Sequence, residues 1–225
     1  HCARLSRLPS TIVANSEAGR RAHVLLGYRP DRFAVIENGI DTERFRPDAE
    51  ARAAVRNDYG LGANTPLIAI VARVDPMKDY LTFIQALDRL DGVQALAIGE
   101  GTEGLGEIER MISLGRRDDV PRLLAACDVV VSSSAFGEGF SNTIAEGMAC
   151  GLPAVATEVG DAARIVGDCG HLVPPRDPSA LAAAVRALLD DDAAALGVRA
   201  RARIEQEFSV PRMVASFNAL HGIGV

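Results

Sequence analysis

The sequence lacks the features that mark several specialised classes of protein. No stretch approaches the roughly 20 consecutive apolar residues needed to span a bilayer, and we expect no secretory signal peptide. Positive charge is not in excess, because 24 Lys and Arg stand against 30 Asp and Glu, which gives a net charge of −6. The chain therefore has no overall basic field to hold nucleic acid, and any phosphate must be bound locally.

Cysteine and histidine are too few and too scattered to indicate a metal site. The 4 cysteines include no Cys-x-x-Cys pair, and the 4 histidines show no ligand spacing. We expect reduced cysteines of a cytosolic protein, no disulfide framework and no metal, with structural roles for the histidines.

What is present is an ordinary globular composition. The 225 residues are 48% hydrophobic and 24% charged, which is enough to bury a sizeable core. The length suits one large domain or a domain with part of another. The first residue is His1 rather than Met, so we expect a processed product or a fragment of a longer chain.

From Pro66 onward, apolar runs alternate with amphipathic segments. Residues 67–72 form a continuous apolar run, as expected for a strand covered on both faces of a parallel sheet. Further strands are expected at 11–14, 33–36, 94–98, 110–114, 128–132, 153–157 and 170–173, and helices at 15–26, 83–90, 181–189, 193–208 and 212–221. This alternation predicts an α/β fold with a doubly wound, Rossmann-like parallel sheet, whose ligand crevice lies at the carboxyl ends of the strands.

The stretch from Ser132 to Pro153 carries the strongest chemical signal. It follows an apolar strand, crosses a loop with two glycines and enters a helix for which Ser141, Asn142 and Thr143 are candidate N-caps. A helix start with free amides is an anion site, and phosphate is its natural ligand. Glu138 and Glu146 flank that start and can only accept hydrogen bonds when ionised. A phosphate-bearing, hydroxyl-rich ligand such as a nucleotide sugar fits this arrangement.

The same stretch carries a family resemblance. Glu138 and Glu146 form a Glu-x7-Glu spacing within Gly-Glu-Gly-Phe-Ser-Asn-x3-Glu-x-Met-Ala-x-Gly-x-Pro, followed by Val155-Ala156-Thr157-x2-Gly160. The sequence resembles the donor half of retaining GT-B glycosyltransferases, specifically glycosyltransferase family 4. The string Asn38-Gly39-Ile40-Asp41-x3-Phe45-x-Pro47, which begins with a strong turn signal, resembles the passage between the two GT-B domains.

The resemblance implies the C-terminal half of a GT-B fold. Residues 1–40 would be the tail end of an N-terminal acceptor domain with its linker. Residues 41–210 would be the nucleotide-sugar-binding domain, and residues 211–225 a helix that crosses back to the N-terminal domain. The charge and glycines of residues 46–65 predict a surface helix and loop before the next domain.

The resemblance also implies which residues bind the donor. Arg73 and Lys78 follow a strand end, and two solvated loop cations would be the usual interpretation of such a pair. Their match to the family's Arg-x4-Lys loop implies instead that they hold the donor diphosphate and stabilise the charge on the leaving group. Glu138 would accept hydrogen bonds from the donor sugar, and Glu146 from the ribose.

The backbone supplies the remaining implied contacts. Amides of Gly139, Phe140 and Ser141 would cradle the sugar, while the Phe140 side chain has a strong alternative role in packing. Amides of Asn142 and Thr143 would bind the distal phosphate. In the family, the segment around Arg117 reads the nucleobase largely through its backbone.

The implied reaction moves a sugar from a nucleoside diphosphate to an acceptor hydroxyl with retention of configuration. We expect same-face attack without a covalent nucleophile, no cofactor and no metal. The acceptor, a glycan or lipid-linked glycan, would be bound by the missing N-terminal domain, with at most peripheral membrane contact. We expect a cytoplasmic location or the inner face of the membrane. The isolated chain should bind nucleotide weakly and transfer nothing.

Two alternatives remain open. Gly99-x-Gly101-x-x-Gly104 follows a strand and could be the dinucleotide-binding turn of an NAD-dependent oxidoreductase. Against this, the motif follows the second strand of the unit, and the short stretch to the next strand leaves little room for a crossover helix. The other alternative is a non-catalytic sugar-nucleotide-binding module. One departure from the family is Gly147, where Ala is common; glycine there should loosen the helix by roughly 1 kcal/mol.

Overall fold

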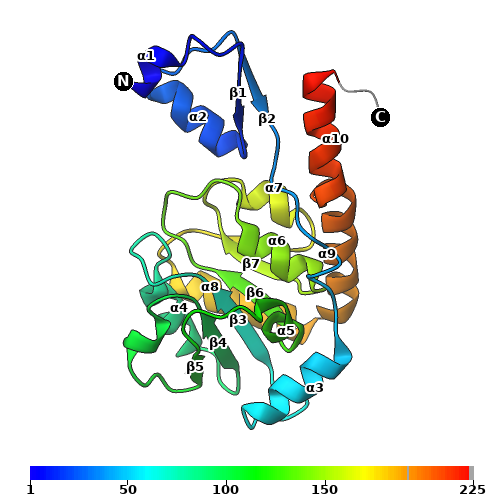
Figure 1. Cartoon of the computed structure of the whole chain (residues 1–225). Helices are drawn as coiled ribbons and strands as arrows, with labels where there is room; N and C mark the ends of the chain where they lie inside the picture. The colour runs from blue at the N-terminus through cyan, green and yellow to red at the C-terminus, as the bar shows by residue number, and fades with distance from the viewer. Residues whose placement is uncertain (192, 223–225) are drawn as a thin grey trace.

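The computed structural model describes residues 1–191 and 193–222. In these residues a six-stranded parallel sheet is flanked by helices on both faces, and a separate two-stranded parallel sheet lies nearer the N-terminus (Figure 1). The strands are β1 (Thr11–Ala14), β2 (Arg32–Val35), β3 (Leu67–Val71), β4 (Gln94–Ile98), β5 (Met111–Ser113), β6 (Val129–Ser132), β7 (Ala154–Thr157) and β8 (Gly170–Val173). The helices are α1 (Cys2–Leu5), α2 (Glu17–Leu25), α3 (Ala49–Asp58), α4 (Tyr80–Leu87), α5 (Val120–Ala125), α6 (Asn142–Ala149), α7 (Ala162–Val166), α8 (Pro178–Asp190), α9 (Ala193–Glu207) and α10 (Val210–His221), with the 3-10 helix η1 at Thr102–Leu105.

The strand order of the large sheet is β5-β4-β3-β6-β7-β8, and every neighbouring pair is parallel. The chain therefore winds outward from β3 in one direction and then from β6 in the other. The expected doubly wound α/β sheet is confirmed. In such a sheet, ligands bind at the carboxyl ends of the strands where the order reverses, which here is between β3 and β6.

Two hydrophobic cores, one on each face, explain the continuous apolar strands. In β3, Leu67 and Ala69 pack into one core while Ile68 and Ile70 pack into the other. The first core contains residues of α3, α5, α6, α7 and α9, and the second contains residues of α4 and α8. Because side chains alternate across a strand and both faces are covered, every position must be apolar.

The N-terminal segment, residues 1–35, is a small unit set apart from the large sheet (Figure 1). It contains α1, α2 and the parallel pair of β1 and β2. The C-terminal helix α10 extends from the large domain toward the level of this unit (Figure 1). The proposed boundaries at residues 40 and 210 stay predictions, and residues 223–225 of the predicted last segment lie outside the described residues.

The expected turn at Asn38-Gly39 is wrong. These residues are part of an extended passage in which Ile40 pairs with Ser209 in a parallel bridge. The amide of Ile40 donates to the carbonyl of Phe208, and the amide of Val210 donates back to Ile40. Gly39 is needed for close approach, because a Cβ atom there would lie 2.7 Å from the Cα of Val210. The segment that leads from the N-terminal unit into the large domain and the segment between α9 and α10 therefore run side by side.

Two further expectations about local structure need correction. Gly147 does not simply loosen α6, because a Cβ atom there would lie 2.6 Å from the Cβ of Val130. The glycine lets α6 pack closely on β6. Helix α3 lies in the predicted region 46–65 but is not only a surface helix, since the Arg56 side chain is 4% exposed and binds Asp128. By contrast, the segment after Gly101 forms only η1, as its short length predicted.

No helix in the part of the chain that the structure describes is long and apolar enough to cross a membrane. Three of the cysteines, Cys127, Cys150 and Cys169, are buried, and Cys2 is exposed.

Candidate functional site

An ion pair between Lys78 and Glu138 lies where the strand order of the sheet reverses. Lys78 belongs to the loop after β3 and Glu138 to the loop after β6, and their side chains are only 17% and 11% exposed. The hydroxyl of Ser134 also donates to Oε1 of Glu138, at 2.6 Å. The structure therefore brings together two residues that the sequence assigned to one site.

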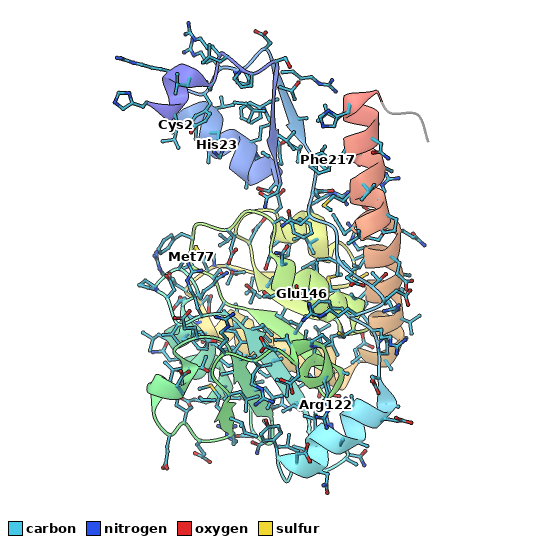
Figure 2. All side chains as sticks on the ribbon, viewed as in Figure 1. Cys2, His23, Met77, Arg122, Glu146 and Phe217 are labelled. Carbon is cyan, nitrogen blue, oxygen red and sulfur yellow. The ribbon has the colours of Figure 1, made fainter. Side chains whose placement is uncertain are left out.

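Hydrogen bonds tie these two loops to each other. The Ser133 hydroxyl donates to the carbonyl of Lys78 at 2.8 Å, and the Ala135 amide donates to the carbonyl of Met77 at 2.7 Å. Figure 2 labels Met77 in this region, beside α4. Thr157, at the end of β7, donates to the Ser134 carbonyl at 2.6 Å. The ion pair is thus held in a rigid frame built from the ends of three strands.

Arg73 lies in the same loop as Lys78 but is more open to solvent. Its Nε atom is 3.4 Å from Oδ2 of Asp75, and its side chain is 57% exposed. The amide of Met77, followed by the positive charges of Arg73 and Lys78, lowers the pKa of Asp75 below its ordinary value. Both cations therefore lie near one acidic loop residue, although Arg73 does not bind Glu138.

The start of α6 offers free backbone amides. Ser141 occupies the N-cap position, but its hydroxyl does not bond a helix amide and lies instead 3.5 Å from the Thr143 hydroxyl. Within the described residues, the amides of Asn142 and Thr143 have no acceptor. Thr143 and Lys78 line one small hollow of about 10 Å³ at the ends of β3 and β6. Donors and a positive helix end therefore lie close to the ion pair.

Gly139 and Phe140 lie between Glu138 and this helix start. The Phe140 ring is buried and lies 5.5 Å from the Phe208 ring, so its side chain packs in the core as the alternative interpretation proposed. A Cβ atom on Gly139 would lie 2.8 Å from the hydroxyl oxygen of Ser16, in the N-terminal segment. At these two residues only the backbone is available to a ligand, because the Phe140 side chain is buried and Gly139 has none.

Glu146 of α6, labelled in Figure 2, lines a cavity of about 320 Å³ together with Asn38, Arg44 and Asn142. The Asn38 side-chain amide donates to the Asn142 side chain at 2.9 Å, which fixes one wall. Burial raises the pKa of Glu146 to about 7, and Arg44 acts weakly in the opposite direction. This carboxyl group is therefore only partly ionised near neutral pH.

Arg117 is not gathered with the residues above. It lies between β5 and α5 and forms a two-pronged ion pair with Asp119, with both nitrogen–oxygen distances at 2.8 Å. The preceding loop is fixed through Gly115, whose amide donates to the buried Thr102 hydroxyl at 2.8 Å.

The glycine turn after β4 has a packing role. A Cβ atom on Gly99 would lie 2.0 Å from the carbonyl oxygen of Ala72, and one on Gly101 would lie 3.2 Å from the Cβ of Val74. The glycines therefore let this turn lie directly against the loop that carries Arg73. Because only the short η1 follows, no long helix directs its amides at a dinucleotide.

Sequence reasoning missed Ser134, Asn38 and Asp161. Ser134 stands in a run of three serines at a strand end, which was the available signal. Asn38 was noted as part of a turn and of the string between the two domains, without a role in the site. Asp161 accepts hydrogen bonds from the N-terminal segment, and nothing in its local sequence indicates this. Among the described residues, no group of three or more His, Cys, Asp or Glu side chains is arranged to hold a metal ion.

Comparison with known proteins adds to this geometry. The family model for glycosyl transferases group 1 matches residues 65–191. The chain belongs to this family of group 1 glycosyltransferases. The match contains both strand-end loops and the whole of α6, so the Lys78–Glu138 pair lies within the matched family region.

Individual relatives agree with the family. The D-inositol 3-phosphate glycosyltransferase of Xylanimonas cellulosilytica is 37% identical over 205 residues, which cover 80% of this chain and 49% of that protein. The GDP-mannose-dependent alpha-(1-6)-phosphatidylinositol monomannoside mannosyltransferase of Mycolicibacterium smegmatis is 35% identical over 188 residues, with 72% and 49% covered. The chain spans about half the length of the curated relatives it matches.

The fold has a close counterpart among solved structures. The crystal structure of Anabaena Alr3699/HepE in complex with UDP and glucose has a TM-score of 0.89 and 28% identity to this chain. The similarity covers 98% of this chain and 65% of that one. The fold of this group 1 glycosyltransferase chain is therefore the α/β arrangement of GT-B enzymes, and the dinucleotide-binding alternative is not favoured.

Proposed function

We propose that the complete protein transfers a sugar from a nucleoside-diphosphate sugar to an acceptor hydroxyl, and that this chain supplies the donor-binding half. The observation that carries the proposal is the Lys78–Glu138 pair next to the free amides at the start of α6. Cationic and amide donors suit a diphosphate, whereas a carboxylate suits sugar hydroxyls. The HepE structure, which contains UDP and glucose, supports a donor of this class.

In this proposal the donor lies across the ends of β3 and β6. Lys78 and Arg73 bind the diphosphate, together with the amides of Asn142 and Thr143. Glu138 accepts hydrogen bonds from the sugar. The backbone amides of Gly139, Phe140 and Ser141 contact the sugar. Glu146 binds the ribose, and the segment around Arg117 lies next to the base.

The same residues provide the chemistry of the transfer. As the glycosidic bond breaks, negative charge grows on the leaving diphosphate, and fixed cations stabilise it in proportion to that growth. Two side-chain cations and a helix start allow this step without a divalent metal or another cofactor. We further propose retention of configuration, with the leaving phosphate helping to deprotonate the acceptor on the same face of the sugar.

The acceptor site belongs, in this proposal, to a further N-terminal domain that packs on residues 1–35. Large apolar side chains on this unit are exposed, including Leu8 at 80%, Leu25 at 88% and Leu26 at 70%. Exposed apolar side chains of this size on one small unit are typical of a surface that another part of a protein covers. We propose a glycan or lipid-linked glycan as acceptor, and a cytoplasmic site of action that includes at most peripheral contact with the inner face of the membrane.

Nucleotide titration tests the donor assignment. Calorimetry with UDP, GDP, ADP and NAD should give binding to one or more nucleoside diphosphates and none to NAD. The titration also identifies the base of the donor, because one relative is GDP-mannose-dependent and HepE was solved with UDP. Tight binding of NAD with no response to the diphosphates would overturn the proposal in favour of an oxidoreductase.

A transfer assay separates an enzyme from a silent binding module. The full-length protein should transfer sugar, Arg73→Ala should abolish transfer, and the isolated chain should transfer nothing. Arg122→Ala is a suitable control, because Arg122 is also exposed but pairs with Asp58, away from this site (Figure 2). Donor binding without transfer by the full-length protein across acceptor glycans and lipids would support the module instead.

A further inference from the structure

The start of α2 in the N-terminal segment is bonded to Asp161 in the large domain. The amide of Glu17 donates to Oδ2 of Asp161 at 2.7 Å, and the amide of Ala18 donates to Oδ1 at 2.8 Å. Ser16, the N-cap residue, accepts from the Gly19 amide at 3.0 Å. Asp161 therefore satisfies two helix-start amides across a separation of more than 140 residues.

This contact is buried and electrostatically favourable. Asp161 is 5% exposed and Ser16 is 0% exposed. A carboxylate that is removed from water needs compensating hydrogen bonds, which the two amides and the positive end of the α2 dipole provide. The pairing is thus directional and ties one end of α2 to one turn of the large domain.

The turn that holds Asp161 is also joined to the loop of the candidate donor site. The Asp161 amide donates to the carbonyl of Gly139 at 3.1 Å. Gly160 has a positive φ of +64°, and a Cβ atom there would lie 2.6 Å from the carbonyl oxygen of Glu138. Gly139 also lies against the Ser16 hydroxyl, because a Cβ atom on Gly139 would lie 2.8 Å from the Ser16 hydroxyl oxygen. The backbone at Glu138 and Gly139 therefore contacts both the Asp161 turn and the N-cap of α2.

We propose that Asp161 is a positioning residue that couples the docking of the N-terminal segment to the placement of the donor-sugar loop. When α2 is docked, Ser16 and Asp161 both contact Gly139, and Glu138 keeps its place beside Lys78. When α2 is released, that loop loses its contact with Ser16. Asp161 contacts no donor atom in this account and acts through the backbone of Gly139.

This role rests on the proposed transfer reaction, but the coupling itself can be measured without it. Hydrogen exchange of the full-length protein, followed by mass spectrometry, should be compared for Asp161→Ala, Asp161→Asn and Asp177→Ala. Asp177 is the matched control, because it caps α8 through the Ala180 amide at 2.9 Å and does not touch the N-terminal segment. Loss of either cap should lower thermal stability to a similar extent.

We expect Asp161→Ala to speed exchange both at residues 16–19 and at residues 137–141. Asp161→Asn should have a smaller effect, because an amide keeps one acceptor oxygen and the size of the side chain. Asp177→Ala should speed exchange only at the start of α8. Faster exchange at 16–19 with an unchanged 137–141 loop in both Asp161 variants would overturn the coupling.

Transfer kinetics provide the second measurement. Asp161→Ala should lower kcat by about 10-fold to 100-fold, as expected when a reacting group is misplaced, and leave the dissociation constant of the bare nucleoside diphosphate within about twofold. Asp177→Ala should change neither. An unchanged kcat in Asp161→Ala would overturn the positioning role. If neither the wild-type protein nor any variant transferred sugar, the proposed function would be wrong. The hydrogen-exchange measurement would still decide whether α2 docking is coupled to the loop at residues 137–141.

Discussion

Lys78 and Glu138 neutralise each other across the two loops that meet where the strand order reverses. Because both side chains are mostly buried, removing one of them leaves the other as an uncompensated charge that is largely shielded from water. Ser134 also bonds Glu138, so the carboxylate keeps one partner when the lysine is occupied elsewhere. A donor that binds both residues would therefore exchange one set of charge contacts for another, with little new desolvation.

Substituting the two partners should separate phosphate binding from sugar binding. Lys78→Ala should weaken binding of a bare nucleoside diphosphate by about tenfold or more, because a charge-assisted contact to phosphate is lost. Glu138→Gln should leave that affinity within about threefold but lower kcat of the full-length protein by about 10². Calorimetry and steady-state kinetics measure the two effects. Equal loss of nucleotide affinity in both variants would contradict the division of roles.

Glu146 should make stability and donor binding respond to pH in opposite directions. Burial raises its pKa in the folded protein from 4.5 to about 7, so the folded state binds the extra proton between these values. The contribution of Glu146 to the free energy of unfolding should therefore be greatest below about pH 4.5 and should fall as the pH rises to about 7. Glu146→Gln should remove that loss and stabilise the protein at pH 8 by up to about 3 kcal/mol.

The same substitution should weaken the ligand. If the ionised carboxylate accepts hydrogen bonds from the ribose, nucleotide affinity in the wild-type protein should fall as pH drops below about 7. Glu146→Gln should bind more weakly at pH 8 and lose this pH dependence. Denaturant unfolding and nucleotide titration at pH 5 and pH 8 test both statements. A variant that is no more stable than the wild type at pH 8 would contradict the account of Glu146 burial.

Gly147→Ala should destabilise the protein although alanine favours helices. The added methyl group would lie 2.6 Å from the Val130 Cβ, and overpacking of this kind costs about 1–3 kcal/mol. This overpacking cost cancels or exceeds the roughly 1 kcal/mol that alanine would gain through its higher helix propensity. Gly104→Ala is the matched control, because a Cβ atom there meets nothing within 4 Å. Chemical denaturation should show a clear loss only for Gly147→Ala, and a stabilised Gly147→Ala would show that α6 does not pack so closely on β6.

Arg56 should be the most sensitive residue of α3. Its guanidinium group bonds Asp128 at 3.0 Å and also the backbone carbonyls of Gly62, Thr65 and Ala126. Arg56→Ala removes all of these bonds, although Arg52 still donates to Asp128 and to the Ala126 carbonyl, and it should cost about 3 kcal/mol. Arg52→Ala should cost less, because that side chain is 36% exposed and Arg56 still pairs with Asp128. Urea unfolding measures both variants, and a similar loss of stability in Arg56→Ala and Arg52→Ala would contradict this ranking.

Elements whose signal is local could be predicted from the sequence. The strand at 67–71 is continuous and apolar because two cores cover it, and that pattern is visible in the residues themselves. The α6 region was found because a strand end, glycines and helix-start residues follow one another directly. Phe140 was correctly expected to pack in the core.

Features that depend on a distant partner could not be predicted. Gly147 looked like a weak point in a helix because Val130 lies in another element. Asn38-Gly39 looked like a turn because its pairing with the chain near Val210 joins residues about 170 positions apart. Arg56 and Asp161 are ordinary surface residue types, and only the fold shows that each is buried against groups far along the chain.

A crystal structure of the full-length protein with an intact nucleoside-diphosphate sugar tests the central claim most directly. The account predicts that the diphosphate oxygens lie within hydrogen-bonding distance of Lys78, Arg73 and the Asn142 and Thr143 amides, with sugar hydroxyls on Glu138. A donor bound away from the ends of β3 and β6, with Lys78 and Glu138 still paired only to each other, would contradict it.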